Sequence, residues 1–277
     1  MRIIDIRVRV PYKSFQKAAI FAEPDSMDAW AKKFGVARPT KLGTMENVLA
    51  DMDAAGVSLA CVSGRRGHNV ENKDIAEMCA QYGDKLLGFP EIDPNDGVDL
   101  GLGEIEEYVV NGPCHGVAVE PGFNRRGALR ANDERFYFIY EKCQQHNLPL
   151  YLNFGGFIGP DYRYCDPAMV EDIAQTFPNL RILLAHAAYP YVLKACHVAM
   201  NHEHIYLGTD MYAFNIPGGD MYIKAANSFI GDKIVFGSAY PIFSIEAAKN
   251  YYLNCGLRED VLPQVMAGNA AKFLGIE

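Results

Sequence analysis

The stretch Leu180–Pro190, LRILLAHAAYP, decides how we interpret the rest of the chain. Its apolar run, Ile182–Ala185, is short, and small residues, an aromatic residue and a proline follow it. This pattern is typical of a β-strand that is buried on both faces. His186 stands at the carboxyl end of the predicted strand, where parallel α/β proteins open their ligand crevices. A lone histidine at this place is also compatible with a satisfied core side chain.

Composition limits the class of protein. The chain has 277 residues, of which 49% are hydrophobic, and a net charge of −8 without any cluster of basic residues. The length fits one large α/β domain or two ordinary ones, and the charge argues against nucleic acid as a partner. No run approaches the roughly 18 apolar residues of a membrane span, so we expect no membrane partner. Seven scattered cysteines, none in a C-x-x-C pair, and the lack of a signal-peptide layout favour a cytoplasmic protein with reduced thiols. A homodimer stays open as an assembly.

Eight apolar, β-rich runs alternate with segments of helical periodicity. The predicted strands are Ile3–Val10, Val57–Ser63, Lys85–Ile92, His115–Glu120, Leu148–Phe154, Leu180–His186, His204–Thr209 and Lys233–Ser238. The predicted helices are Met45–Ala55, Asn72–Tyr82, Asp99–Asn111, Asn132–His146, Pro167–Phe177, Tyr189–Met200, Asp220–Ile230 and Glu246–Cys255, with one or two short helices in the tail, Glu259–Ile276. The alternation predicts an α/β fold, a single-domain (β/α)8 TIM barrel over residues 1–277. A doubly wound open sheet is the alternative.

One connection is much longer than the others. Pro11–Gly43 joins the first strand to its helix and carries four large aromatic residues: Phe15, Phe21, Trp30 and Phe34. Long connections of this kind are often functional. Because this segment leaves the carboxyl end of the first strand, we predict a long loop that acts as a lid over the catalytic face.

Polar side chains stand where five of the predicted strands end. Active sites of (β/α)8 barrels are built at this end of the strands. The period-2 spacing on strand 1 predicts that Asp5, Arg7 and Arg9 share one face of it. The other candidates are Arg65 and Arg66, Glu120, Asn153, His186, Asp210, Tyr212 and Tyr240. Together they predict a polar site at the barrel mouth.

Several motifs, taken in order, resemble those of one family. They are IIDIRVRV (3–10), LPLYLNFGG (148–156), PNLRILLAHAAYP (178–190), HIYLGTD (204–210), KIVFGSAYP (233–241) and GNAAKFLG (268–275). The chain resembles the amidohydrolase-related TIM-barrel proteins of the amidohydrolase 2 type, which include aromatic-acid decarboxylases and lactonases. The resemblance implies a divalent metal that activates water, held by a His-x-His on strand 1, a His on each of strands 5 and 6, and an Asp on strand 8.

This sequence departs from that ligand pattern. Arg7 and Arg9 stand at the His-x-His, Asn153 replaces the strand 5 His and Ala239 replaces the strand 8 Asp, so that only His186 remains. An arginine keeps its proton and cannot bind a metal. We therefore predict a divergent member that lacks the usual metal site, and we expect no cofactor.

Three arrangements could replace the metal. In the first, Glu120 and Asp210 neutralise Arg7 and Arg9, and the ions only hold the mouth together. In the second, the two arginines bind a substrate carboxylate, for which a planar guanidinium is well suited. His186 is then the acid or base, because histidine titrates near neutrality. In the third, Glu120, His186 and Asp210 hold a relocated Zn or Mn ion, since three protein ligands make a legitimate catalytic site.

The second arrangement leads to the expected activity. We predict a metal-free hydrolase that acts on a small carboxylate-bearing substrate, such as a lactone or an aromatic acid. The catalytic candidates are His186, Asp210 and Glu120, and the substrate-binding candidates are Arg7, Arg9, Asn153, Tyr212 and Tyr240. A decarboxylase of the same family and a non-catalytic ligand-binding barrel are the alternatives.

Overall fold

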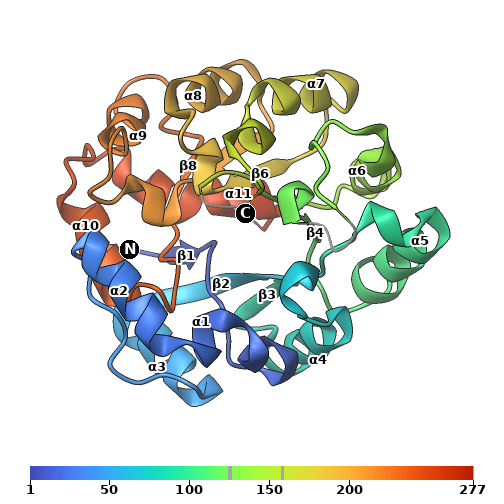
Figure 1. Ribbon diagram of the computed structural model, residues 1–277. Helices are drawn as coiled ribbons and strands as arrows, with labels where there is room; N and C mark the ends of the chain where they lie inside the picture. The colour runs from blue at the N-terminus through green and yellow to red at the C-terminus, as the bar shows by residue number, and fades with distance from the viewer. Residues whose placement is uncertain (124–126, 157–158, 277) are drawn as a thin grey trace.

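The computed structural model describes residues 1–123, 127–156 and 159–276, which form the predicted (β/α)8 barrel. Figure 1 looks down the barrel and shows the helices as a ring around the strands. The strands are β1 Ile3–Asp5, β2 Val57–Ser63, β3 Leu86–Phe89, β4 Val117–Val119, β5 Leu150–Asn153, β6 Ile182–Ala185, β7 Ile205–Gly208 and β8 Ile234–Val235. Each strand is parallel to the neighbour it pairs with. The carboxyl ends of the strands therefore meet at one mouth.

Two short seams close the barrel. The strands form two ladders, β1-β2-β3 and β4-β5-β6-β7-β8. Single parallel bridges, Glu91 with Ala118 and Val8 with Tyr240, join the ladders on both sides. The N–H of Ile6 also donates to the carbonyl of Phe236 at 3.1 Å. Closure brings the ends of β1 and β8 together, 230 residues apart in sequence.

The helices follow the predicted alternation. They are α3 Met45–Ala55, α4 Asn72–Tyr82, α5 Val98–Ile105, α6 Tyr137–Gln145, α7 Ala168–Thr176, α8 Val192–Asn201, α9 Asp220–Ala226, α10 Ile245–Asn254 and α11 Asn269–Leu274. The spans predicted for α3 and α4 agree at both ends, and the Thr44 hydroxyl caps α3 by accepting the N–H of Asn47. The helix predicted over Asp99–Asn111 ends in a π-helical segment, Glu106–Val110. No helix in the described ranges is long and apolar enough to cross a membrane.

The hydrophobic core has two layers. One lies between the strands and the surrounding helices, and the other fills the barrel itself with side chains such as Ile4, Ile6, Phe89 and Leu183. Helix α11 belongs to this inner layer, where Phe273 stacks on Phe89 with 6.2 Å between ring centroids. The tail therefore plugs one end of the barrel, so a ligand has to enter at the other.

The strand predicted over Ile3–Val10 is wrong in its second half. Regular pairing ends at Asp5, and Ile4 and Ile6 both lie inside the barrel. The cause is the Asp5 carboxylate, whose Oδ1 accepts the N–H groups of Arg7 and Ser238, each at 2.9 Å. This side-chain acceptor takes the Arg7 N–H out of the ladder. The chain bends, and Asp5 does not share a face with the arginines.

The segment Pro11–Gly43 is not a loop. It forms a 3₁₀ helix, η1 Lys13–Lys17, and two helices, α1 Ala19–Ala22 and α2 Pro24–Phe34. Phe34 packs edge-on against Phe243 at 5.5 Å, which fixes the end of α2 to the barrel. Figure 1 shows α1 and α2 in blue beside the first strands. Movement of this segment as a lid stays a prediction.

Candidate active site

A cavity of about 230 Å³ opens at the carboxyl ends of the strands. Its polar side is basic and includes Arg7, Arg9, Arg65, His68, His186 and Tyr212. Its apolar side includes Phe15, Ile20, Met27, Trp30, Phe123 and Ile242. The helical segment after β1 thus supplies much of the apolar side, while residues at strand ends supply the charges. A cavity of this composition suits a small ligand with an anionic head and an apolar body.

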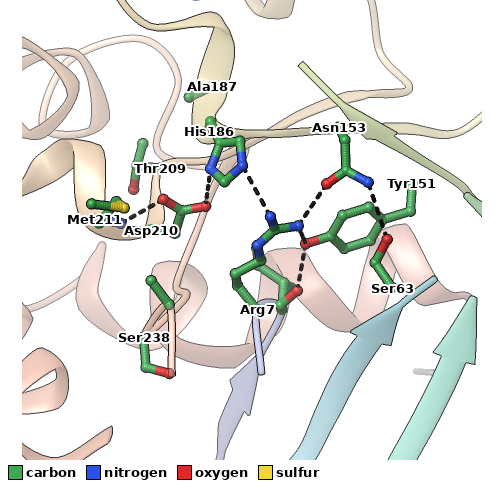
Figure 2. Close-up of polar contacts among 12 residues, drawn as sticks. Arg7, Ser63, Tyr151, Asn153, His186, Ala187, Thr209, Asp210, Met211 and Ser238 are labelled. Atoms are coloured by element: carbon green, nitrogen blue, oxygen red, sulfur yellow. Dashed lines mark hydrogen bonds and ion pairs between the residues drawn. The ribbon is translucent and has the colours of Figure 1, made fainter. Parts of the chain in front are cut away.

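Arg7 is the centre of a buried hydrogen-bond network, which Figure 2 shows. Its Nη1 donates to Oδ1 of Asn153 at 2.6 Å and to the hydroxyl of Tyr151 at 3.2 Å. Its Nη2 lies 3.0 Å from Nε2 of His186. Asn153 in turn donates from Nδ2 to Oγ of Ser63 at 3.1 Å. These contacts fix the guanidinium on β1, β5 and β6 at once.

His186 is held from both sides. Its Nδ1 lies 2.7 Å from Oδ2 of Asp210, and its Nε2 faces the Arg7 guanidinium. Since a guanidinium can only donate, Nε2 carries the lone pair and the ring proton is on Nδ1, toward Asp210. Burial and the charge of Arg7 outweigh the pull of Asp210 and lower the pKa of His186 to about 4. The imidazole is therefore neutral at pH 7.

The backbone around this pair is strained. His186 has φ 71°, Asp210 has φ 34° and Ala239 has φ 60°, although none is glycine. Left-handed backbone at such residues costs on the order of 1–3 kcal/mol each and concentrates at functional sites. These strained positions stand just after β6, β7 and β8, at the barrel mouth.

The two arginines that follow β1 differ in their electrostatics. Burial opposes the charge of Arg7, but Tyr151, Asp210 and Glu120 outweigh it and raise its pKa. Burial and the neighbouring charges of Arg7 and Arg65 lower the pKa of Arg9 to about 9. Within the described part of the chain, the Arg9 guanidinium donates hydrogen bonds only to main-chain carbonyls, those of Ala239 at 3.1 Å and Tyr240 at 3.4 Å. The environment therefore favours the cation at Arg7 and disfavours it at Arg9.

The direct ion pairs of the first arrangement, Arg7 and Arg9 with Glu120 and Asp210, do not form among the described residues. Glu120 is fully buried and forms its ion pair with Arg65, whose Nε lies 3.1 and 3.2 Å from the two carboxylate oxygens. Asp210 contacts His186 instead of an arginine. The difference arises because Arg65 follows β2 and enters the mouth beside β4.

The remaining predicted residues lie in different places. Asn153 and Asp210 stand behind the cavity surface, in contact with Arg7 and His186. Tyr212 lines the cavity, packs edge-on against His186 at 5.1 Å and fills space that a side chain at Gly156 would take. Tyr240 is buried outside that surface, where burial and the Asp51 carboxylate raise the pKa of its phenol. We assign its phenol no contact with a ligand.

Sequence reasoning missed two polar residues of the site. Tyr151 lies two residues before Asn153 on β5 and also points into the barrel. Its hydroxyl accepts a hydrogen bond from Arg7 and donates one to the carbonyl of Ile6 at 3.0 Å. His68 lines the cavity beside Phe123, with ring centroids 5.7 Å apart. Burial and the charge of Arg65 lower the pKa of His68 to about 4. The period-2 pattern of β5 could have indicated Tyr151, but no local signal marks His68.

Solved structures share this architecture. An uncharacterised TIM-barrel protein from Bordetella bronchiseptica, Bb4693, is 29% identical with a TM-score of 0.92, over 100% of this chain and 99% of that chain. The 2,6-dihydroxybenzoate decarboxylase from Rhizobium is 16% identical with a TM-score of 0.70, over 99% and 98%. A dihydroxybenzoic acid decarboxylase from Polaromonas, solved with manganese and the inhibitor 2-nitroresorcinol, is 16% identical with a TM-score of 0.67, over 99% and 97%. The last two similarities establish the fold alone.

The residues at the mouth do not fit a divalent metal. A guanidinium nitrogen lies 3.0 Å from Nε2 of His186 and would repel a cation there. Glu120 is engaged by Arg65, and the Asn153 oxygen is engaged by Arg7. Across residues 1–123, 127–156 and 159–276, no three His, Cys, Asp or Glu side chains are grouped to hold an ion. This geometry does not support the relocated zinc or manganese site on Glu120, His186 and Asp210.

The sequence itself identifies the family. No curated protein matches the chain. The profile of the family described as Amidohydrolase matches residues 36–276, which is most of the chain and includes the ends of β2 to β8. Together with the barrel architecture, this match shows that the chain belongs to the amidohydrolase family.

Proposed function

We propose that the protein is a metal-free hydrolase that cleaves a lactone or ester of a small carboxylate-bearing, partly aromatic compound. The observation that carries this proposal is the neutral, Asp210-oriented His186 beside a basic and otherwise apolar cavity. A base has to be unprotonated to accept a proton, and a histidine whose pKa is about 4 meets that condition at neutral pH.

Arg7 and His186 together can activate water. Nη2 of Arg7 now occupies the lone pair of His186 Nε2 at 3.0 Å, so a water molecule would reach Nε2 only when this contact opens, and it would then accept a hydrogen bond from Nη2 and donate one to Nε2. Attack of the water oxygen on the carbonyl carbon transfers a water proton to His186. Collapse of the tetrahedral intermediate breaks the C–O bond, and the leaving oxygen takes that proton. Arg7 offers positive charge to the developing anion, as a metal would in related enzymes.

Decarboxylation is the second candidate. It is favoured by relatives whose names give aromatic acids as substrates, 2,6-dihydroxybenzoate among them. Loss of CO2 from an aromatic acid requires a proton donor at the ring carbon. A histidine that is neutral at pH 7 is a poor donor, and a basic site stabilises the carboxylate of the ground state. For these reasons we place hydrolysis first.

The test is a panel of substrates with and without a carboxylate. We expect the protein to hydrolyse aryl esters or lactones that carry a carboxylate. It should not hydrolyse the analogues in which a neutral carboxamide replaces that carboxylate. His186→Gln should lower kcat/KM by about 10²–10⁴, the range for loss of a general base. CO2 release from 2,6-dihydroxybenzoate without any ester cleavage would replace hydrolysis by decarboxylation. Activity that survives His186→Gln unchanged would exclude the proposed base.

A further inference from the structure

Arg7 and Arg9 lie two residues apart after β1 but have different surroundings. Arg7 contacts side chains from β5 and β6 through both terminal nitrogens. The hydrogen bonds that described residues make with the Arg9 guanidinium engage Nη1 only, and both acceptors are carbonyls. Arg9 is 9% exposed and lines the cavity, so its charge is nearly removed from water.

The carboxylates around the mouth either contact other residues or have a raised pKa. Glu120 pairs with Arg65, and Asp210 faces Arg7 through His186. Asp5 accepts two main-chain N–H groups, and burial raises its pKa. Burial and the nearby Glu120 also raise the pKa of Glu91 well above its usual range. Neither Arg7 nor Arg9 has a carboxylate contact among the described residues, but the terminal nitrogens of Arg7 are engaged by side chains, whereas the Arg9 guanidinium donates only from Nη1 to two carbonyls.

We infer that Arg9 alone anchors the substrate carboxylate, while Arg7 is a positioning residue that keeps His186 in its Nε2-acceptor form. This inference rests on the proposed function and assigns different roles to two arginines that the sequence treats as a pair. A buried charge without a counter-ion is unfavourable, and an incoming carboxylate removes that cost. Nε and Nη2 of Arg9 form the edge of the guanidinium left for bidentate pairing.

The same geometry limits the ligand to one carboxylate. Among the described residues that line the cavity, Arg65 is paired with Glu120 and both terminal nitrogens of Arg7 are engaged by side chains, so a second carboxylate on the ligand would find no other open guanidinium edge. The apolar side of the cavity, with Met27, Trp30 and Phe123, suits a ring-sized body. The substrate class is therefore an aromatic monocarboxylate, not a dicarboxylate.

The experiment measures binding of benzoate by calorimetry and by thermal stabilisation, with benzamide as the neutral isostere and isophthalate as the dicarboxylate. We expect the parent protein to bind benzoate and not benzamide, and to gain nothing from the second carboxylate of isophthalate. Arg9→Met should weaken benzoate binding at least about 30-fold. Arg135→Met is the matched control, because Arg135 is exposed and pairs with Asp133 in its own turn, and it should bind benzoate like the parent.

A second measurement tests Arg7 without relying on a variant that folds poorly. Nitrogen chemical shifts of the His186 ring should report a proton on Nδ1 and none on Nε2, both with and without benzoate. Failure of the parent to bind any of the acids would contradict both the proposed function and the anchor. Benzoate binding that Arg9→Met leaves intact would contradict the anchor alone. A proton on Nε2 would contradict the role given to Arg7.

Discussion

Arg7→Met should lower the free energy of unfolding by about 3–5 kcal/mol, because several buried polar partners would lose their donor at a cost of about 1–3 kcal/mol each. The substitution removes donors from Asn153, Tyr151 and His186, which are all buried. The raised pKa of Arg7 also predicts a loss of stability on substitution, since its surroundings favour the cation despite burial.

Arg9→Met should change stability by no more than about 1 kcal/mol, because the surroundings of Arg9 disfavour its charge. The Met side chain also keeps most of the apolar stem of the arginine in place. Equilibrium urea denaturation of both variants and the parent measures the contrast. Equal, large losses in both variants would mean that the two arginines only hold the barrel mouth together.

The second large effect is a loss of stability in acid that depends on His186. Its pKa is about 4 in the folded chain, against the ordinary value of 6.5. Between these values the unfolded chain binds a proton that the folded chain does not bind. Stability from this group is therefore complete above pH 6.5 and is lost as the pH falls to 4. This difference of about two and a half pKa units corresponds to about 3 kcal/mol of unfolding free energy.

His186→Gln isolates this effect, because the variant cannot take up that proton. Urea denaturation at pH 7, 6, 5 and 4.5 should show the parent losing stability faster than the variant. The partly buried His68 changes both proteins in the same direction, so it cancels in the comparison. Parallel pH profiles for parent and variant would show that His186 titrates normally and is not held as a neutral base.

The sequence predicts the barrel because each strand and helix carries its own local signal. Thr44 and Gly56 bound α3, and the apolar run Ile182–Ala185 defines β6. The end of β1 could not be predicted from alternation alone. Asp5 accepts N–H groups from Arg7 and from Ser238, which lies 233 residues away in sequence, and a contact of that range leaves no local pattern.

The sequence predicts which polar side chains gather at the barrel mouth better than it predicts their partners there. Arg7, His186 and Asp210 meet as a group because strand ends converge at one mouth. The choice of Arg65 as the partner of Glu120 depends on the path of the chain after β2, which composition does not encode. The helices of the segment after β1 were missed because their aromatic residues indicate burial without indicating secondary structure.

The central claim is that guanidinium groups take the place of a metal at this barrel mouth. A crystal structure of the protein grown with both manganese and benzoate tests it most directly. The account predicts a planar carboxylate on the Arg9 guanidinium, Nη2 of Arg7 still close to the His186 ring, and no manganese signal at the mouth. A manganese ion bound by His186 and Asp210, with Arg7 turned away from the ring, would contradict it.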